Sequence, residues 1–455
     1  MENRQEDNKL GTMPVGKLLL SMALPMMMSF FIQALYNIVD SIFVARISEN
    51  ALTAVSLAFP MQSVMNAIAV GTGVGMSALI PRAIGRKDRD AADDVANTGI
   101  FLNLLYVVVF VILGIVLVRP FYQMQTDIAE IVEGGITYLR IVWILGFGVF
   151  FGVYFEKMLT STGFATLAMA SQASGAVFNI IFDPLLIFGL GPFPRMGIAG
   201  AATATVMGQI LASFVAFFLN VRRNSWIRLS VGRVFRPSGR AAKEIYRIGI
   251  PSMVTIGLNS VTSFLVNQVL LGYSTTATAV YGIWLKLQNF CFMPAFGMNN
   301  GMVPILSYNY GTRAIGRVRA TIRYALTSIM SLMLVLTVVL EMIPGVLLVL
   351  FDASENMMQI GMVALRILIL SLVFGGANII IGSAMQALNH ASYTLLMNIF
   401  RNFVMPAGGV FLLSLLFGKL DIVWAAIPIG EVLTFLLGVF LYRKMTGHLK
   451  KMDRE

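Results

Sequence analysis

The chain is poor in the residues that bind metal ions or form disulfide bonds. Its 455 residues include two histidines and one cysteine, Cys291. A lone cysteine excludes a disulfide within one chain, and such a residue usually behaves as a small apolar side chain. The sequence also lacks the Gly-x4-Gly-Lys-Ser/Thr loop that cradles nucleotide phosphates. We therefore expect no metal centre of this kind, no bound cofactor and no ATP-driven chemistry.

Charged residues are also scarce. They make up 12% of the chain against 57% apolar residues, whereas a soluble domain usually carries about a quarter charged residues. Many windows exceed the roughly 18 apolar residues that cross a bilayer as a helix. Because these runs are continuous and do not alternate, they favour helices over the strands of a barrel. The composition excludes a soluble protein.

We predict an all-α polytopic membrane protein with twelve transmembrane helices. The first six spans are expected at 16–43, 51–80, 95–118, 137–160, 168–190 and 198–220. The last six are expected at 245–272, 277–305, 320–348, 361–387, 394–417 and 422–443.

The two halves of the chain are related by a constant offset in residue number, which we call the repeat offset. Pro25 returns as Pro251, and three further pairs keep the same spacing: Gly75 and Gly301, Gly85 and Gly311, Arg140 and Arg366. The protein is therefore expected to be two copies of a six-helix bundle. Doubled units of this kind usually carry a solute pathway, with binding sites near the repeat interface. A secondary transporter is the function that this pattern favours.

Basic residues are concentrated in particular loops, although the net charge of +11 would suggest a nucleic-acid partner in a soluble protein. We predict an N-terminal half at 1–220, a basic cytoplasmic linker at 221–244, a C-terminal half at 245–443 and a basic cytoplasmic tail at 444–455. By the positive-inside rule, both termini lie in the cytoplasm. We expect a bacterial inner membrane location, no nucleic-acid partner, and linker contacts with anionic lipid.

Acidic and amide side chains within the predicted spans are the strongest candidates for a functional site, because a charge in a membrane helix is costly. Asp40 lies in the outer half of span 1, with Asn37 on the same helix face. Asp183 lies in the outer half of span 5, with Asn179 one turn below it. Thr205 lies about two turns into span 6, so these groups are expected to meet at one depth.

Such a cluster of carboxylates, amide and hydroxyl is suited to holding a proton or a bare Na+. A carboxyl group that is removed from water beside a second carboxyl group retains a proton more readily. The alternative is that Asp40 and Asp183 only make hydrogen bonds between neighbouring helices.

Other candidates for a substrate or gate site are weaker. Glu156 lies in the inner half of span 4, and we expect the adjacent Lys157 not to neutralise it because i and i+1 do not share a helix face. Snorkelling of Glu156 to the membrane interface is the alternative to an inner-gate or substrate-carboxylate role. Lys286 in span 8 is a candidate counter-charge, proton-linked group or structural pairing partner. Glu431 is expected to be an interfacial or helix-start residue at the beginning of span 12. Flexible and amide side chains that suit varied apolar cations are Met61 and Gln62 in span 2 and Gln288 and Met293 in span 8.

Five short strings are distinctive: Tyr-Asn-Ile-Val-Asp at 36–40, Val-Gly-Thr-Gly-Val-Gly at 70–75, Asn-Ile-Ile-Phe-Asp-Pro at 179–184, Gly-Ala-Ala-Thr-Ala-Thr at 200–205 and Pro-Ile-Leu-Ser-Tyr-Asn-Tyr-Gly at 304–311. They resemble patterns of the multidrug and toxic compound extrusion (MATE) family, and the branch resembles its MepA-like bacterial members. The resemblance covers nearly the whole chain.

The resemblance implies a V-shaped pair of bundles that export lipophilic organic cations in exchange for H+ or Na+, with roles in drug and antibiotic resistance. It assigns ion binding or relay to the residues that match the family's first-half site, namely Asp40, Asn179, Asp183 and Thr205. We also include the neighbouring Tyr36 and Asn37 in the predicted cation-coupling set. Spans 7 and 10 lack the acids of another branch, which argues against a second-half site of that kind. A monomer suffices for this architecture.

Three other readings compete with a multidrug antiporter. The major facilitator superfamily also has two copies of six spans, and the loop at 85–89 resembles its basic loop after span 2. However, the acidic residue that precedes the glycine in that family's loop pattern is missing here. A flippase for lipid-linked precursors or other amphiphiles is the main functional rival. An intramembrane enzyme or receptor is disfavoured, since no nucleophile–base pair occurs in the spans.

Overall fold

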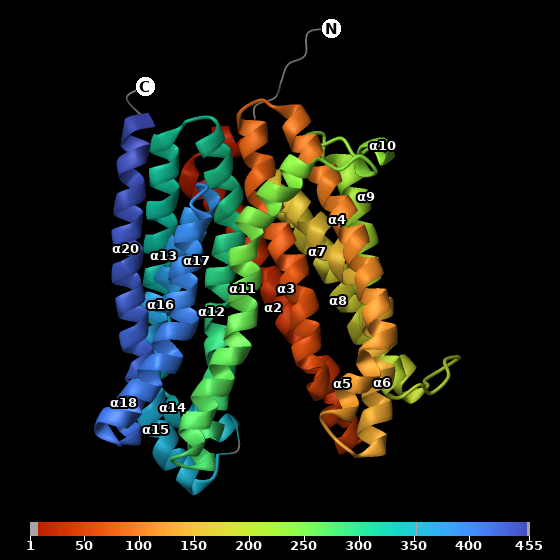
Figure 1. The fold of residues 1–455 in the computed structure, drawn as a ribbon, viewed down its shortest axis with the longest axis vertical. Coiled ribbons are helices and arrows are strands. Elements are labelled where there is room, and N and C mark those ends of the chain that lie inside the picture. Colours follow the sequence, from red (N-terminus) through yellow and green to blue (C-terminus); the bar gives the residue numbers. More distant parts are fainter. Residues whose placement is uncertain (1–7, 352, 453–455) are drawn as a thin grey trace. The chain divides into compact units, whose positions relative to one another are not determined.

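The computed structural model describes residues 8–351 and 353–452. For residues 447–452 it describes the backbone alone. The last basic residues of the predicted tail, including Lys450, Lys451 and Arg454, lie outside the described side chains. Every regular element in the described part of the chain is helical, which confirms the predicted all-α class (Figure 1). The helices form two compact units. The first contains Leu24–Met253 with the described residues up to Thr12, and the second contains Met13–Ala23 with the chain from Val254 onward.

Six consecutive spans form each half of the chain. In the first half they are α2 (Val15–Ala45), α3 (Glu49–Gly85), α4 (Arg89–Val116), α6 (Ala129–Ile144) continued by α7 (Phe147–Ser161), α8 (Ala165–Phe188) and α9 (Ile198–Arg223). In the second half they are α11 (Gly239–Leu271), α12 (Thr275–Gly311), α13 (Ile315–Met342), α15 (Glu355–Ile369) continued by α16 (Ser371–Ala387), α17 (Ala391–Ile399) continued by η1 (Phe400–Gly408) and α18 (Gly409–Phe417), and α20 (Ala426–Met452). Short helices connect them: α1 (Lys9–Thr12), α5 (Val118–Gln123), α10 (Val231–Val234), α14 (Pro344–Leu350) and α19 (Leu420–Val423).

Eleven of these spans in the described chain have the length and apolar composition to cross a bilayer. The remaining one, α12, is as long as α3 at 37 residues, but Lys286 and several asparagines make it more polar. The repeat identifies α12 as a span, because both its first and its last residue follow those of α3 by the repeat offset.

The backbone confirms the predicted repeat in detail. Helices α4 and α13 are both 28 residues long, and the repeat offset separates them as well. Ser48 and Ser274 cap α3 and α12 in the same way, each accepting a hydrogen bond from the backbone N–H three residues later at 3.0 Å. Lys87 and Arg313 both adopt the left-handed conformation, with φ of 61° and 59°. The two halves therefore share one backbone plan, down to their turns.

Two spans that we predicted as continuous helices are bent. The span at 129–161 bends by 44° between α6 and α7, and the span at 355–387 bends by 41° between α15 and α16. At the first break the helix tightens, since the N–H of Gly146 donates to the carbonyl of Trp143 at 3.2 Å. An apolar run does not reveal such a bend because hydropathy is unaffected by it.

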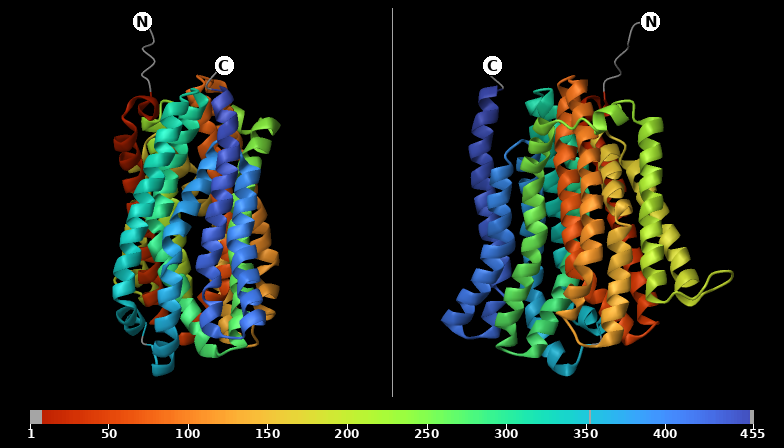
Figure 2. Two further views of the ribbon diagram at one scale, coloured as in Figure 1. Left: turned by 90° about the vertical axis from the view of Figure 1, so that its left-hand side faces the viewer. Right: turned by 45° about the vertical axis from the view of Figure 1, so that its right-hand side comes forward.

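The span at 391–417 also departs from the predicted regular helix. Its middle turns, η1, have π-helical geometry around Pro406, and the hydroxyl of Thr262 donates to the carbonyl of Asn402 at 2.5 Å. A proline removes one backbone donor, and the widened turns leave carbonyls that side chains satisfy. Figure 2 shows this span beside α16 and α20 within the second unit.

The basic linker is held against the N-terminal turns of α4. The carboxylate of Asp93, which is buried, accepts from the backbone N–H of Arg228 at 2.7 Å, and Asn97 accepts from that of Ser230 at 2.9 Å. Arg233 pairs with Asp90 at 2.8 Å. Part of the linker's positive charge is therefore used within the protein, and its contact with anionic lipid stays a prediction.

Helices α8 and α9 make a close backbone contact at two glycines, Gly175 and Gly208. A Cβ atom on Gly208 would lie 2.7 Å from the carbonyl oxygen of Gly175, and one on Gly175 would lie 2.6 Å from that of Gly208. Small residues permit this backbone contact in membrane helices. The contact fixes the spacing between Asn179 and Thr205, which lie one turn away on the two helices.

We predict that Gly208→Ala separates α8 from α9 and lowers the melting temperature of the purified protein by about 4 °C or more. Gly257→Ala is the matched control, because nothing lies within 4 Å of a Cβ at Gly257. Thermal unfolding in detergent measures both, and equal melting temperatures for the two variants would contradict the packing argument.

Candidate functional site

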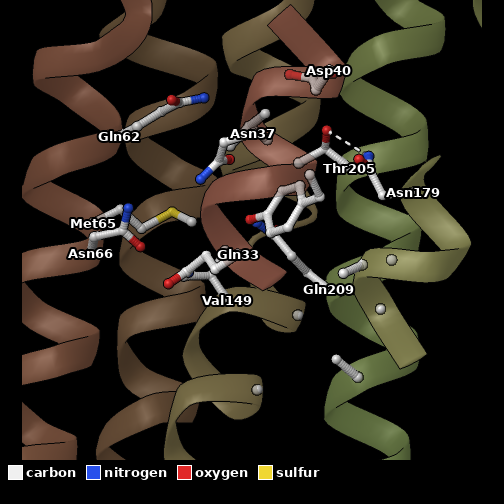
Figure 3. Close-up of a pocket in the computed structure, with 18 of the residues that line it drawn as sticks. Gln33, Asn37, Asp40, Gln62, Met65, Asn66, Val149, Asn179, Thr205 and Gln209 are labelled. Atoms are coloured by element: carbon white, nitrogen blue, oxygen red, sulfur yellow. Dashed lines mark hydrogen bonds between the residues drawn. The ribbon is translucent and has the colours of Figure 1, made fainter. Parts of the chain in front are cut away.

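A cavity of about 500 Å³ lies within the first unit, lined by residues of α2, α3, α6, α7, α8 and α9 (Figure 3). Its polar lining consists mostly of carboxamides, namely Gln33, Asn37, Gln62, Asn66, Gln172, Asn179 and Gln209. Asp40 is the one charged side chain among the described residues that line it. A carboxamide offers both a donor and an acceptor, so this wall is polar, adaptable and nearly neutral.

The structure brings four of the predicted cation-coupling residues together at one end of this cavity. The amide nitrogen of Asn179 donates to Asp183 at 3.1 Å and to the hydroxyl of Thr205 at 3.3 Å. Asp40 of α2 lies within hydrogen-bonding reach of Asp183 of α8. The helical spacing predicted this meeting, while the role of the residues stays a prediction.

The electrostatic feature of this cluster is an excess of acceptors. Asp40 Oδ1, Asp183 Oδ2 and Asn179 Oδ1 are buried, and none of them has a hydrogen-bond donor among the described residues. Two facing carboxyl groups cannot both be ionised without a positive charge between them. Most buried polar groups in proteins have partners, so this arrangement is suited to a proton or a small cation.

An apolar layer closes the cluster one helical turn away. Val44, Ile187 and Ala201 are each four residues from Asp40, Asp183 and Thr205, and each is 0% exposed. Together with Ala51 they form one packed cluster. The layer excludes water on that side, which strengthens electrostatic interactions within the polar layer.

The other members of the predicted coupling set line the cavity wall. Tyr36 and Asn37 both line the cavity. The side chain of Tyr36 forms a hydrogen bond with that of Gln33 and interacts electrostatically with Asp40 and Asp183. Tyr36 is therefore an electrostatic neighbour of the cluster.

Our expectation for Glu156 and Lys157 was wrong in one respect. The two side chains form an ion pair, with 3.9 Å between Lys157 Nζ and Glu156 Oε1. Both are buried, so their long flexible stems fold toward each other despite the helical offset between adjacent residues. Glu156 also accepts a hydrogen bond from Gln172 of α8, which lines the cavity.

The remaining candidates are divided between the two units. Gln62 lines the cavity and donates to the hydroxyl of Tyr138 at 3.2 Å, whereas the adjacent Met61 is not among its lining residues. Lys286, Gln288 and Met293 belong to the second unit. Lys286 is exposed, and its ammonium lies 5.8 Å from the centroid of the Phe351 ring.

Glu431 lies in the second turn of α20, near the start of the last span as expected. It is also buried, which we did not predict, and its two carboxylate oxygens accept from Arg401 at 2.9–3.0 Å. Asn378 donates to the same carboxylate at 2.6 Å. The repeat offset relates Glu431 to Thr205, a member of the predicted cation-coupling set. This correspondence could have indicated that Glu431 is buried within its bundle.

We predict that Asp40→Asn and Asp183→Asn each raise the melting temperature by about 2–4 °C in buffer without added sodium at neutral pH. The introduced amide gives the remaining carboxyl group a donor and removes a like charge. Asp93→Asn is the control, because its carboxylate accepts a backbone N–H, and it is expected to lower the melting temperature. If the two site variants also destabilise the protein, the carboxyl groups have only a structural role.

The chain is similar to known transport proteins over nearly its whole length. The MatE family model matches residues 25–185 and 251–410, two ranges whose starts again differ by the repeat offset. The multidrug export protein MepA of Staphylococcus haemolyticus is 25% identical over 96% of this chain and 95% of its own. An FAD transporter of Shewanella oneidensis is 24% identical over 85% of this chain and 86% of its own.

Two solved structures show the same similarity in three dimensions. An outward-facing multidrug resistance MATE family transporter of the MOP superfamily superposes with a TM-score of 0.91, at 28% identity over 99% of this chain and 100% of that one. A MOP superfamily transporter from Pyrococcus furiosus, described as having a binding pocket of reversed polarity that suggests a different function, also gives 0.91, at 27% identity over 99% and 100%.

Proposed function

Because the chain belongs to the MatE family of membrane transporters, we propose that it exports lipophilic organic cations in exchange for H+ or Na+. It acts as a secondary antiporter, and its Asp40–Asp183 cluster binds the coupling ion. The protein works in a bacterial cytoplasmic membrane with both termini in the cytoplasm, and one chain is sufficient. The multidrug export relatives support the substrate class.

The observation that carries this proposal is the pair of facing carboxyl groups in the first unit. Asp40 and Asp183 come from different helices, lie beneath an apolar layer and have buried oxygen atoms that accept no hydrogen bond from the described part of the chain. Asn179 and Thr205 add an amide and a hydroxyl oxygen, which are ligands that suit Na+ as well as a proton. Either ion would remove the repulsion between the carboxyl groups.

The lining of the cavity favours a cationic substrate over an anionic one. The described lining residues include Asp40 and several carboxamides but no lysine or arginine. A dianion such as FAD would meet no positive charge at this wall, whereas an organic cation would meet a carboxylate, two tyrosines and the thioether of Met65. The lining therefore supports export of cations rather than FAD transport.

Coupling requires that the ion and the substrate prefer different states of the protein, because a ligand shifts an equilibrium only through its differential affinity. Ion binding at Asp40 and Asp183 neutralises the cluster and allows α2 to repack against α8. Substrate then leaves outward, and release of the ion into the cytoplasm restores the negative charge for the next cation. A flippase for amphiphiles would not need this ion site.

We predict that purified protein in liposomes exports ethidium when a proton gradient or a sodium gradient is imposed, and that Asp40→Asn abolishes this coupled transport. The substitution removes the charge that the ion must neutralise while preserving the size of the side chain. Imposing the two gradients separately identifies the ion.

Asp127→Asn, an exposed acid before α6, is the matched control and should export ethidium as the unsubstituted protein does. Normal coupled efflux by Asp40→Asn would exclude this site from coupling. If neither gradient drives efflux by the unsubstituted protein, an amphiphile flippase is the better account.

A further inference from the structure

A second buried carboxylate lies directly behind the cavity wall. Gln172 of α8 lines the cavity, and its amide nitrogen donates to Glu156 of α7. Glu156 is only 4% exposed. One carboxamide therefore separates this carboxylate from the interior of the cavity.

This carboxylate is distant from the Asp40–Asp183 cluster. Gln172, Asn179 and Asp183 lie on one stripe of α8, at intervals of seven and four residues, so all three face the same side of the helix. The eleven positions from Gln172 to Asp183 correspond to about 16 Å along the helix axis. The cavity thus has acidic groups toward both of its ends.

The charge of Glu156 is only partly compensated by its neighbours. The 3.9 Å to Lys157 Nζ exceeds the roughly 2.7–2.9 Å of a direct charge-assisted hydrogen bond. The stem of Lys157 packs against Gly73 of α3, where an added Cβ would lie 2.9 Å from Lys157 Cγ. That packing restrains the lysine at one side of the carboxylate, while a neutral amide covers its cavity side.

In the second half, by contrast, the charge of the Glu431 carboxylate is fully compensated by a neighbouring cation. Glu431 receives three contacts of 2.9–3.0 Å from the guanidinium of Arg401 and a further bond from Asn378. The guanidinium also lies 5.6 Å from the ring centroid of Phe292. A tethered cation already occupies that carboxylate, whereas Glu156 has a neutral amide, that of Gln172, toward the cavity.

We propose that Glu156 is the carboxylate that receives the positively charged group of the substrate, with Gln172 as the amide that covers it between transport cycles. The inference rests on the proposed export of organic cations and adds a substrate site separate from the ion site. Rotation of the Gln172 side chain exposes Glu156 to the cavity. Substrate and coupling ion then occupy opposite ends of one cavity, and each opposes binding of the other through their like charge.

The test is equilibrium binding of tetraphenylphosphonium to the purified full-length protein, with tetraphenylborate as an anion of nearly the same size and shape. The unsubstituted protein is expected to bind the phosphonium and not the borate. Glu156→Gln keeps the shape of the side chain and should weaken phosphonium binding at least about tenfold. Gln172→Lys places a tethered ammonium beside Glu156 and should abolish it.

Glu133→Gln, the same change at an exposed acid of α6, is the control and should bind as the unsubstituted protein does. If Glu156→Gln does not fold, Gln172→Lys decides the question, because it retains the carboxylate of Glu156. Phosphonium binding that is unchanged in the folded variants overturns the inference and leaves the proposed function standing. Failure of the unsubstituted protein to bind phosphonium overturns both.

Discussion

Two carboxyl groups that face each other inside a membrane bundle impose the main constraint on this protein. Charged groups of like sign at short range, shielded from water by Val44, Ile187 and Ala201, are stable only with a positive charge between them. Asp40 and Asp183 belong to different helices, so in the proposed mechanism the presence or absence of that charge alters how α2 packs against α8. This placement supports the proposed ion-dependent equilibrium.

The internal repeat gives the two halves one backbone and different chemistry. Helices such as α3 and α12 correspond residue for residue, with the same caps and the same left-handed turns. Yet the first half places Asp40 and Asp183 beside a polar cavity, and the second half pairs Glu431 with Arg401. Glu431 occupies the position that corresponds to Thr205, so the two halves place different chemistry on the same backbone.

The sequence predicted much of this because periodicity and offset are properties of the chain itself. Long apolar runs located the spans, and helical spacing placed Asp40, Asn179, Asp183 and Thr205 at one depth. The bends between α6 and α7 and between α15 and α16, and the π-helical turns of η1, could not be predicted. They arise from packing and hydrogen bonding, which hydropathy does not register.

Side-chain conformation accounts for the other differences. The Glu156–Lys157 pair depends on how two flexible stems fold, which helix geometry alone does not determine. The burial of Glu431 depends on Arg401, from the preceding span, reaching the same point in space. The amide-rich cavity wall comes from six helices, so no single segment of the sequence contained its pattern.

The account's central claim is that a small cation and the substrate oppose each other's binding through the first unit. Counting the ions released when tetraphenylphosphonium binds to purified protein tests this most directly, by proton release in weak buffer and by displacement of radioactive sodium. The account predicts that about one proton or sodium ion leaves for each phosphonium bound, and none in Asp40→Asn. Phosphonium binding without release of either ion from the unsubstituted protein would contradict it.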